Sequence, residues 1–341
     1  MKVVHSALHA RHDGGMEIHR GRFVPTFESP ARAEMIRAAL VAAGHELLAP
    51  REIPESRLLR IHDAEFVDFL RGAWARWEAE GRTECMLPSG FPARGLRRDR
   101  RPTGISGAMG YYAFDSSTPI VAGTWDAALA AARSAVTAAA IVSAGQAAAY
   151  ALCRPPGHHA GTSTYGGYCF LNNAALAAQY LLDEGCTRVA VIDVDYHHGN
   201  GTQEIFWERG DVFFTSLHGT PDTEYPYFLG YADERGAGPG EGCTLNLPLP
   251  EGTGWRDYRA ALDVALEAVR RFAPEAIVVS LGVDTFAADP ISAFKLEEQD
   301  YPRLGAALAG LRLPTIIVQE GGYAVEEIGR NVAGVLGAFP T

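Results

Sequence analysis

The feature that most constrains the fold is a short apolar run within residues 188–201 that ends abruptly in carboxylates and imidazoles. The four residues from Val189 to Ile192 are typical of a strand that is buried on both faces of a sheet. The ionisable side chains that follow within six positions are Asp193, Asp195, His197 and His198. Burying such groups unpaired would destabilise the fold by several kcal/mol, so the pattern favours a metal site or a hydrogen-bond network over a plain polar loop.

Strand and helix patterns alternate through the second half of the 341-residue chain. The expected strands cover 148–152, 188–193, 212–217, 276–282 and 314–318, and the expected helices lie near 172–185, 199–207, 255–272 and 299–311. The first half is expected to hold strands at 1–5 and 46–49 and helices at 29–44, 55–61, 64–80 and about 124–144. We therefore predict an α/β fold with one domain over residues 1–341, in which helices flank a doubly wound, predominantly parallel sheet.

The carboxyl ends of parallel strands meet at one edge of the sheet, and this edge is where open α/β folds bind ligands. Side chains at period 2 would place Asp193, Asp195 and His197 on one side if the strand continues that far. Asp284 follows the expected strand at 276–282, where an unpaired carboxylate would be unfavourable, and it is the natural third ligand beside Asp195 and His197. This set suits Zn²⁺, and Fe²⁺, Co²⁺ or Mn²⁺ are also able to occupy it, so we predict metal-assisted hydrolysis.

Candidate proton carriers follow the strand expected at 148–152. His158 and His159 come directly after Pro155, Pro156 and Gly157, which imply a fixed backbone, and either imidazole is a candidate for the general base. Asp193 is available to orient one imidazole and Asn200 the other. An Asp partner raises the pKa of an imidazole more than an Asn partner does, so the two histidines need not share a protonation state.

Three tyrosines are candidates for substrate contacts. Tyr323 follows two glycines, and its phenol is placed to donate to the oxyanion that forms when water attacks a carbonyl, unless it simply packs in a turn. Tyr168, which follows Gly166 and Gly167, and Tyr225 either line a narrow apolar channel or belong to the ordinary core.

Composition limits the partners and the compartment. Forty-one acidic and 30 basic residues give a formal net charge of −11, which disfavours nucleic acid and anionic membranes and suits a cationic or neutral substrate. The five cysteines lack Cys-x-x-Cys spacing, so we expect a reducing, cytoplasmic compartment. The start of the chain lacks the pattern of a signal peptide, and the Ala-rich stretch at 126–149 is interpreted as a buried helix because polar residues interrupt it.

The hydrophobic periodicity of helices and strands is absent between residues 81 and 110. This stretch contains three prolines and a cluster of five arginines between Arg94 and Arg101. An irregular excursion of this length is usually functional or disordered. The arginine cluster belongs either to a solvated loop or to a segment that forms a subunit contact or walls an active site.

Five motifs, in this order, resemble the histone deacetylase family of the arginase/deacetylase fold. They are RPPGHHA at 154–160, GYCFLNN at 167–173, DVDYHHGNG at 193–201, SLGVD at 280–284 and EGGY at 320–323. The resemblance covers nearly the whole chain, and residues 206–214, 228–231 and 289–292 look like the bacterial acetylpolyamine amidohydrolase branch. It implies a hydrolase that releases acetate from N-acetylated small alkylamines, such as acetylputrescine or acetylcadaverine.

The resemblance also implies roles for single residues. Asp195, His197 and Asp284 would hold one zinc ion per chain, and a structural potassium ion behind it would use Asp193, Asp195, His197, Ser216 and the carbonyl of Leu217. His159 would be the general base and then the acid that protonates the leaving amine. His158 would pair with Asp193 and His159 with Asn200. His158 would stabilise the transition state, and Tyr323 would polarise the acetyl carbonyl.

The branch further implies that the insertion at 81–102 mediates a homodimer and narrows the mouth of the site. The residues expected along the substrate channel are His19, Gly167, Tyr168 and Tyr225. Ser106 and Ser117 stand where acidic partners for a distal ammonium are expected, although Asp115 is close by. Other small acetamides and acetyl-lysine therefore remain alternative substrates, and a manganese ureohydrolase or a non-catalytic ligand sensor are the other classes considered.

Overall fold

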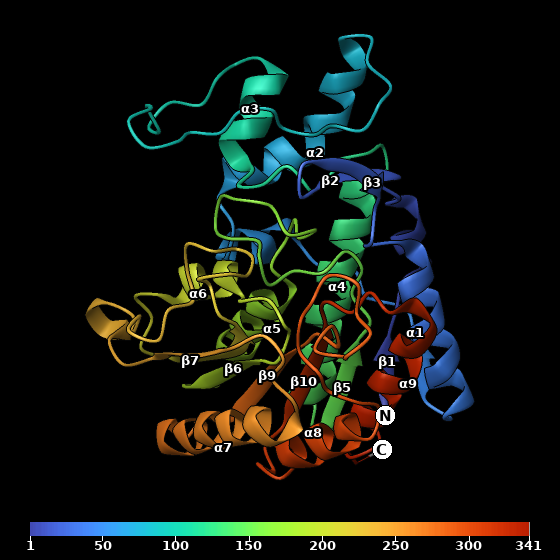
Figure 1. Ribbon diagram of the computed structural model, residues 1–341, viewed down its shortest axis with the longest axis vertical. Coiled ribbons are helices and arrows are strands. Elements are labelled where there is room, and N and C mark those ends of the chain that lie inside the picture. The colour runs from blue at the N-terminus through green and yellow to red at the C-terminus, as the bar shows by residue number, and fades with distance from the viewer. Residues whose placement is uncertain (341) are drawn as a thin grey trace.

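An eight-stranded sheet forms the centre of the protein, as the computed structural model of residues 1–340 shows (Figure 1). The strands follow the order β4-β1-β5-β10-β9-β6-β7-β8, and every neighbouring pair is parallel. Their bounds are β1 Lys2–Val4, β4 Glu46–Leu48, β5 Ala148–Ala151, β6 Val189–Asp193, β7 Val212–Gly219, β8 Thr244–Leu249, β9 Ala276–Leu281 and β10 Thr315–Gln319. The predicted α/β fold with a predominantly parallel, doubly wound sheet is confirmed.

Helices cover both faces of this sheet. The α-helices are α1 Pro30–Ala42, α2 Ala64–Ala79, α3 Ile105–Tyr112, α4 Thr124–Ser143, α5 Asn173–Asp183, α6 Asn200–Phe206, α7 Trp255–Phe272, α8 Asp300–Ala309 and α9 Val325–Leu336, and the 3-10 helices are η1 Ala7–Arg11, η2 Glu55–Arg60 and η3 Gly238–Gly240. On β6, Val189 and Val191 belong to the core layer that includes α4 and α5, whereas Ala190 and Ile192 belong to the layer that includes α1, α7, α8 and α9. Burial on both faces explains the unbroken apolar run.

One strand ends where it was expected and a neighbouring strand ends later than expected. β6 ends at Asp193, so the alternation of side chains along a strand does not reach Asp195 or His197. β7 continues to Gly219, two residues past its expected end, so Ser216 lies well inside the strand. The loop after β6 therefore does the positioning that strand periodicity was expected to do.

Other elements were not expected at all. They are the antiparallel hairpin of β2 Met16–His19 and β3 Arg22–Pro25, the edge strand β8, and the helices α3 and α9. The hairpin strands are only four residues long with mixed polarity, and β8 contains Pro248, so neither gives a clear strand pattern. The expected helix at 55–61 is the 3-10 helix η2.

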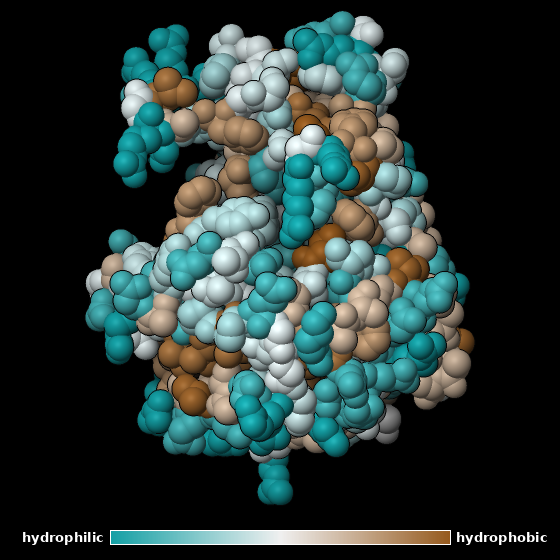
Figure 2. Space-filling model, in the orientation of Figure 1, coloured by the Kyte–Doolittle hydropathy of each residue, from teal (hydrophilic) through white to brown (hydrophobic). Residues whose placement is uncertain are grey.

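Residues 81–102 form an irregular insertion at the top of Figure 1, and Figure 2 shows that its protruding part is largely hydrophilic. Its base is anchored, because the buried Met86 exchanges backbone hydrogen bonds of 2.9 and 3.0 Å with Ile120. The Trp77 indole nitrogen also donates to the Glu84 carbonyl over 2.8 Å. Residues 93–101, in contrast, are exposed. The insertion thus combines a fixed base with a free tip.

Helix α4 is long and apolar enough to cross a membrane by length and composition alone. However, 72% of its most apolar window is buried inside the protein. It packs against β5 and α5 in the core, as the interpretation of the Ala-rich stretch expected.

Two helical glycines give a matched test of packing. A Cβ atom at Gly305 in α8 would collide with the Val335 carbonyl of α9, whereas a Cβ at Gly72 in α2 would meet no atom within 4 Å. Gly305→Ala should therefore lower the free energy of unfolding by about 1–3 kcal/mol. Gly72→Ala should raise it by up to about 1 kcal/mol, because alanine has the higher helix propensity. Urea denaturation of both variants measures the difference, and equal effects would contradict the close approach of α8 and α9.

Candidate active site

The motif residues gather at the carboxyl edge of four neighbouring strands. The segment after β5 carries His158 and His159, and the segment after its neighbour β10 carries Tyr323. The segment after β9 carries Asp284, and the segment after β6 carries Asp195 and His197. Because these strands are adjacent and parallel, their ends lie side by side. All of these side chains are buried, and His159, His197 and Tyr323 line a cavity of about 690 Å³.

Asp195, His197 and Asp284 form a compact group of carboxylate and imidazole ligands whose atoms lie within 4.8 Å of one another. His197 Nδ1 lies 3.0 Å from Asp284 Oδ2 and 3.3 Å from Asp195 Oδ1. The other oxygens are held by the backbone: Gly321 N donates to Asp195 Oδ2 over 2.7 Å, and Tyr196 N donates to Asp284 Oδ1 over 2.9 Å. The segments after β6 and β9 thus bring together the three side chains that the sequence predicts to be metal ligands.

The surroundings of this group fit a divalent cation. Asp195 and Asp284 are fully buried, and burial together with the charge of Asp195 raises the pKa of Asp284 to about 6. Two carboxylates at such close range repel each other unless a cation or a proton lies between them. Cβ atoms at Gly282 and Gly321 would both collide with Asp195 Oδ2, so glycine is required for the backbone to approach the ligands this closely.

The two adjacent histidines have different hydrogen-bond partners, as predicted. His158 Nδ1 lies 3.0 Å from Asp193 Oδ2, and His159 Nδ1 lies 2.6 Å from Asn200 Oδ1. Because an amide oxygen only accepts, His159 Nδ1 must carry the hydrogen, and a neutral His159 therefore keeps its lone pair on Nε2. The imidazole centroids are 4.0 Å apart, so the charge of one ring is felt by the other.

The partners drive the pKa values of the two imidazoles in opposite directions. Burial alone lowers the pKa of His158, but the carboxylates of Asp195 and Asp193 outweigh it and raise the pKa to about 10. His159 has an amide in place of a carboxylate partner, so burial and then the charge of His158 hold its pKa well below the usual range. At neutral pH the chain therefore offers one cationic imidazole and one neutral imidazole.

Tyr323 lies in a loop that several buried groups hold in place. Its backbone N–H donates to Asp289 Oδ2 over 2.7 Å, and the guanidinium carbon of Arg32 lies 4.7 Å from its ring centroid. Arg32 also donates to the carbonyls of Gly322, over 2.5 Å, and Glu320, over 2.7 Å. Burial raises the pKa of the Tyr323 phenol well above its usual range, so the phenol keeps its proton and is able to donate it in a hydrogen bond.

Aromatic side chains form the walls of the cavity. Tyr225 lies edge-on to His159, with centroids 5.1 Å apart, and stacks with Phe114 at 6.1 Å. Tyr168 lies 5.7 Å from Tyr323, and His19 lines the outer part of the cavity from the hairpin of β2 and β3. The sequence placed Tyr168, Tyr225 and His19 along a channel, and the structure brings all three to it. Phe114 carried no motif signal and was missed.

Gly167 and Asp115 shape one wall. Gly167 has φ +55°, and a Cβ there would collide with the His159 ring, so only glycine lets this backbone pass. Gly167 N donates to Asp115 Oδ2 over 2.6 Å, and the Tyr225 hydroxyl donates to the same oxygen over 2.9 Å. Ser117 also lines the cavity and donates to the Ile18 carbonyl. Ser106 does not line it: its hydroxyl accepts from Arg82 on the exposed side of α3.

The residues that the resemblance assigns to a potassium ion lie on the neighbouring strands β6 and β7. Asp193 and Ser216 face each other across β6 and β7, and Leu217 is the next residue on β7. All three are fully buried. His198, in contrast, turns away from the metal group and bonds Gln203 Oε1 over 3.0 Å. Only part of the polar cluster after β6 therefore contributes to the site.

Two buried glutamates were missed by sequence reasoning. Glu320 accepts from the backbone of Gly157 over 2.6 Å and of His158 over 3.1 Å, so it fixes the segment that carries the histidines. Glu17 accepts from the Tyr168 hydroxyl over 2.8 Å and from Phe27 N over 3.3 Å. Glu320 stood inside a quoted motif, whereas the only signal for Glu17 was a carboxylate between Met16 and Ile18 in a very short strand.

Comparisons with known proteins agree with this geometry. The family model of the histone deacetylase domain matches residues 26–339. The chain is 53% identical to acetylpolyamine amidohydrolase 1 of Pseudomonas aeruginosa over 99% of both chains, and 50% identical to the acetylpolyamine amidohydrolase of Mycoplana ramosa over 98% of both. It is also similar to the crystal structure of an acetylpolyamine aminohydrolase from Burkholderia pseudomallei, with a TM-score of 0.95, 40% identity, and coverage of 99% of this chain and 98% of that one.

The buried Glu17 predicts a pH-dependent stability. Burial raises its pKa from 4.5 to about 7. The folded state then binds more protons than the unfolded state between these values, so the stability that Glu17 contributes is fully present below pH 4.5 and is lost as the pH rises to about 7. Glu17→Gln removes this loss. The melting temperature of the variant minus that of the wild type should therefore be larger at about pH 8 than at about pH 5.

Thermal denaturation at the two pH values measures this difference. Glu65→Gln is the matched control, because the Glu65 side chain is 78% exposed and the same substitution there removes no buried carboxyl group. A difference for Glu17→Gln that does not change with pH would show that the Glu17 carboxyl is ionised throughout this range.

Proposed function

The chain belongs to the histone deacetylase family, and from this premise we propose that it is an amidohydrolase that removes the acetyl group from small N-acetylated alkylamines, acetylpolyamines in particular. The observation that carries the proposal is the neutral His159, held by Asn200 through Nδ1, next to the group of Asp195, His197 and Asp284. This arrangement provides a base and a metal site beside one cavity, which His159 and His197 line. The reaction consumes water and one amide, and it releases acetate and the free amine.

We propose that Asp195, His197 and Asp284 hold one zinc ion per chain. Two carboxylates and one imidazole leave a coordination position open, as sites that perform hydrolysis require. The chemistry that zinc supplies when bound is Lewis acidity, which polarises the acetyl carbonyl and lowers the pKa of the attacking water. The backbone donors to Asp195 and Asp284 fix the direction of the ligand oxygens and so preorganise the site.

His159 is the proton carrier in this proposal. Its Nε2 lone pair accepts a proton from the attacking water, and the same nitrogen then returns that proton to the leaving amine. Asn200 Oδ1 holds the hydrogen on Nδ1 throughout, so the tautomer does not change during the reaction. An amide partner suits this role, because a carboxylate would stabilise the imidazolium and weaken its ability to protonate the amine.

His158 and Tyr323 stabilise charge instead of moving protons. His158 stays protonated beside Asp193, so it presents a fixed positive charge next to the reacting atoms. Tyr323 keeps its phenolic proton and donates a hydrogen bond to the oxygen of the acetyl group as negative charge develops there. Arg32 and Asp289 hold the Tyr323 loop in place, which lowers the reorganisation needed during the reaction.

The shape and charge of the cavity support a slender amine as substrate. Tyr168, Tyr225 and Phe114 leave an aromatic channel that suits an alkyl chain, and Glu224 lines the same cavity as a candidate partner for a distal ammonium. Ser117 stands in the wall where a further acidic residue was expected. Acetyl-lysine and other small acetamides therefore stay as the alternative substrates. A dinuclear ureohydrolase is disfavoured, because His158, His159 and Tyr323 occupy the positions where further carboxylate ligands would be needed.

We propose further that Asp193, Ser216 and Leu217 contribute to a structural potassium site. The facing positions of Asp193 and Ser216 on β6 and β7, and their complete burial, support oxygen ligation there. A cytoplasmic location is also proposed, which the odd number of cysteines and their irregular spacing support.

A panel of substrates tests the function. The panel holds acetylputrescine, acetylcadaverine, acetylspermidine, an acetyl-lysine peptide and an uncharged N-alkylacetamide of matched length. We expect kcat/KM for the acetylated diamines to exceed that for the neutral analogue by roughly tenfold or more, which corresponds to ~1.4 kcal/mol of transition-state binding. His159→Ala is the control variant for background hydrolysis. Its kcat should be lower by a factor of roughly 10²–10⁴, and its melting temperature should be unchanged.

Each other outcome has a clear meaning. Equal or better activity on the peptide or the neutral amide would identify a deacetylase with a different amine preference. An inactive wild type that still binds these amides would support a ligand sensor.

We also propose that the insertion at 81–102 forms a homodimer contact. The insertion concentrates positive charge in a chain of net charge −11, and Leu96 at its tip is 61% exposed. An apolar side chain among arginines on a protruding loop is well suited to dock against an acidic surface of a second copy. The anchored base at Met86 presents this tip in a fixed direction.

Leu96→Asp should weaken the dimer, because it buries a charge at the contact and removes an apolar side chain. The dissociation constant should rise by about tenfold or more, or ~1.4 kcal/mol. Sedimentation velocity over a concentration series measures it. Val264→Asp is the matched control, since Val264 is 50% exposed on α7, far along the chain from the insertion. A dimer that Leu96→Asp leaves intact, or a monomeric wild type, would refute the contact.

A further inference from the structure

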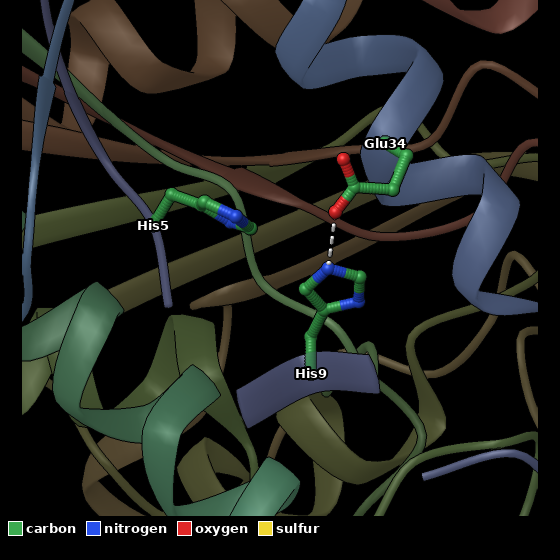
Figure 3. A group of neighbouring side chains, drawn as sticks. All are labelled: His5, His9 and Glu34. Atoms are coloured by element: carbon green, nitrogen blue, oxygen red, sulfur yellow. Dashed lines mark hydrogen bonds and ion pairs between the residues drawn. The ribbon is translucent and has the colours of Figure 1, made fainter. Parts of the chain in front are cut away.

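A second cluster of possible metal ligands lies near the start of the chain, apart from the active site. It consists of His5, His9 and Glu34, which come from three different elements (Figure 3). His5 directly follows β1, His9 is the buried residue of η1, and Glu34 lies in the second turn of α1. The three side chains point toward one another in Figure 3, and no role in the proposed reaction uses them.

The geometry is close to that of a three-ligand site. One atom from each residue lies within 4.8 Å of the other two. His9 Nε2 lies 2.9 Å from Glu34 Oε1, and the rings of His5 and His9 have centroids 5.2 Å apart. Ligand atoms of a tetrahedral zinc ion with bonds of about 2.0 Å lie roughly 3.3 Å apart. Closing the cluster around an ion therefore needs side-chain movements of the order of 1 Å, without a change in the backbone.

The other polar contacts leave the cluster in need of a partner. His5 Nδ1 is buried without a hydrogen-bond partner, and so is His9 Nδ1, which lies on the other side of the ring from the Nε2 that contacts Glu34. Such orphaned nitrogens are unusual, because buried polar atoms are nearly always satisfied. Arg37 Nε donates to Glu34 Oε2 over 2.9 Å, which holds that oxygen aside and leaves Oε1 directed at the imidazoles.

The protonation states also suit metal ligation. Burial lowers the pKa of His5 to about 4 and lowers that of His9, so both imidazoles are neutral at physiological pH and have a lone pair to offer. The hydrogen bond from His9 lowers the pKa of Glu34, which is therefore ionised. Metal binding requires neutral imidazole and ionised carboxylate, so the hydrogen that His9 Nε2 donates to Glu34 Oε1 has to move to His9 Nδ1 when an ion binds.

We propose that His5, His9 and Glu34 form a second metal site, which binds a divalent metal ion such as Zn²⁺. Two imidazoles and one carboxylate match the preference of Zn²⁺, Ni²⁺ and Cu²⁺ for nitrogen-rich ligand sets. The Glu34 side chain is 47% exposed, so the ion has access to solvent and completes its coordination with water. Arg37 offsets the charge of Glu34, so this site binds more weakly than the buried group at the sheet edge.

Binding at this site would clamp the start of the chain to α1. His9 connects further, because its carbonyl accepts from Arg154 Nη1 over 2.6 Å, and Arg154 opens the segment that carries His158 and His159. The ion would therefore stabilise the folded state by mass action and fix the scaffold next to the catalytic segment. The role is structural, since none of the three ligands lines the cavity.

Metal content of untagged protein tests the proposal. After equilibrium dialysis against micromolar free Zn²⁺, elemental analysis should find two zinc ions per wild-type chain and one in Glu34→Gln or His5→Gln. Asp284→Asn should also contain one, held at the second site, so failure of either site is distinguishable from failure of the other. In the Asp284→Asn background, zinc should raise the melting temperature, and adding Glu34→Gln should abolish that rise.

Matched controls separate ligation from general damage. Asp126→Asn removes a carboxylate of α4 that pairs with Arg11, and Arg11 lies in η1 together with His9. His45→Gln removes a half-buried imidazole outside the cluster. Both should keep two zinc ions. Cu²⁺ bound to Asp284→Asn should show coupling to two nitrogens in its electron paramagnetic resonance spectrum, and adding His5→Gln should leave coupling to one nitrogen at most. Equal zinc content in the wild type, Glu34→Gln and His5→Gln would overturn the proposal.

Discussion

The burial of several carboxylates at the ends of apolar strands is the constraint on which the rest of the site depends. Asp193, Asp195 and Asp284 are completely enclosed, and imidazoles and backbone N–H groups compensate their mutual repulsion, as the proposed cation would. The parallel sheet makes this compensation possible, because β6 and β9 are neighbours and deliver their carboxylates to one point. The glycines at 282 and 321 follow from the same constraint, since any side chain there would displace Asp195.

A second buried ion network joins the start of the chain to this edge. Glu28 lies 2.7 Å from Arg32 and 2.9 Å from Arg154, and all three side chains are almost fully buried. Arg32 then reaches the Tyr323 loop, and Arg154 reaches the His9 carbonyl. Removing Glu28 alone would leave two buried cations without a counter-charge, so the network fixes the relative positions of α1, η1 and the loops after β5 and β10.

Sequence patterns predicted the parts of this protein in which local chemistry repeats. The apolar runs of β5, β6, β9 and β10 and the polar residues just beyond them were enough to predict a parallel sheet with a metal group at its edge. The alternation of side chains would place His197 only if the strand continued that far, and because β6 ends at Asp193 a loop does the positioning instead. Glu17 and Arg32 were missed because their importance lies in contacts with residues 151 and 290 positions away.

The hydrogen bonds of Asp115 bear on how the channel selects its substrate. Burial raises the pKa of Asp115, and its carboxylate already accepts from Gly167 N, Tyr225 Oη, Thr118 Oγ1 and Ser117 N. A carboxylate with four donors has little capacity left to bind an ammonium, so its function is to hold Gly167 and Tyr225 in the wall. The proposed recognition of a distal ammonium would then rest on another acidic group that lines the cavity, Glu224, and on the field of an acidic protein.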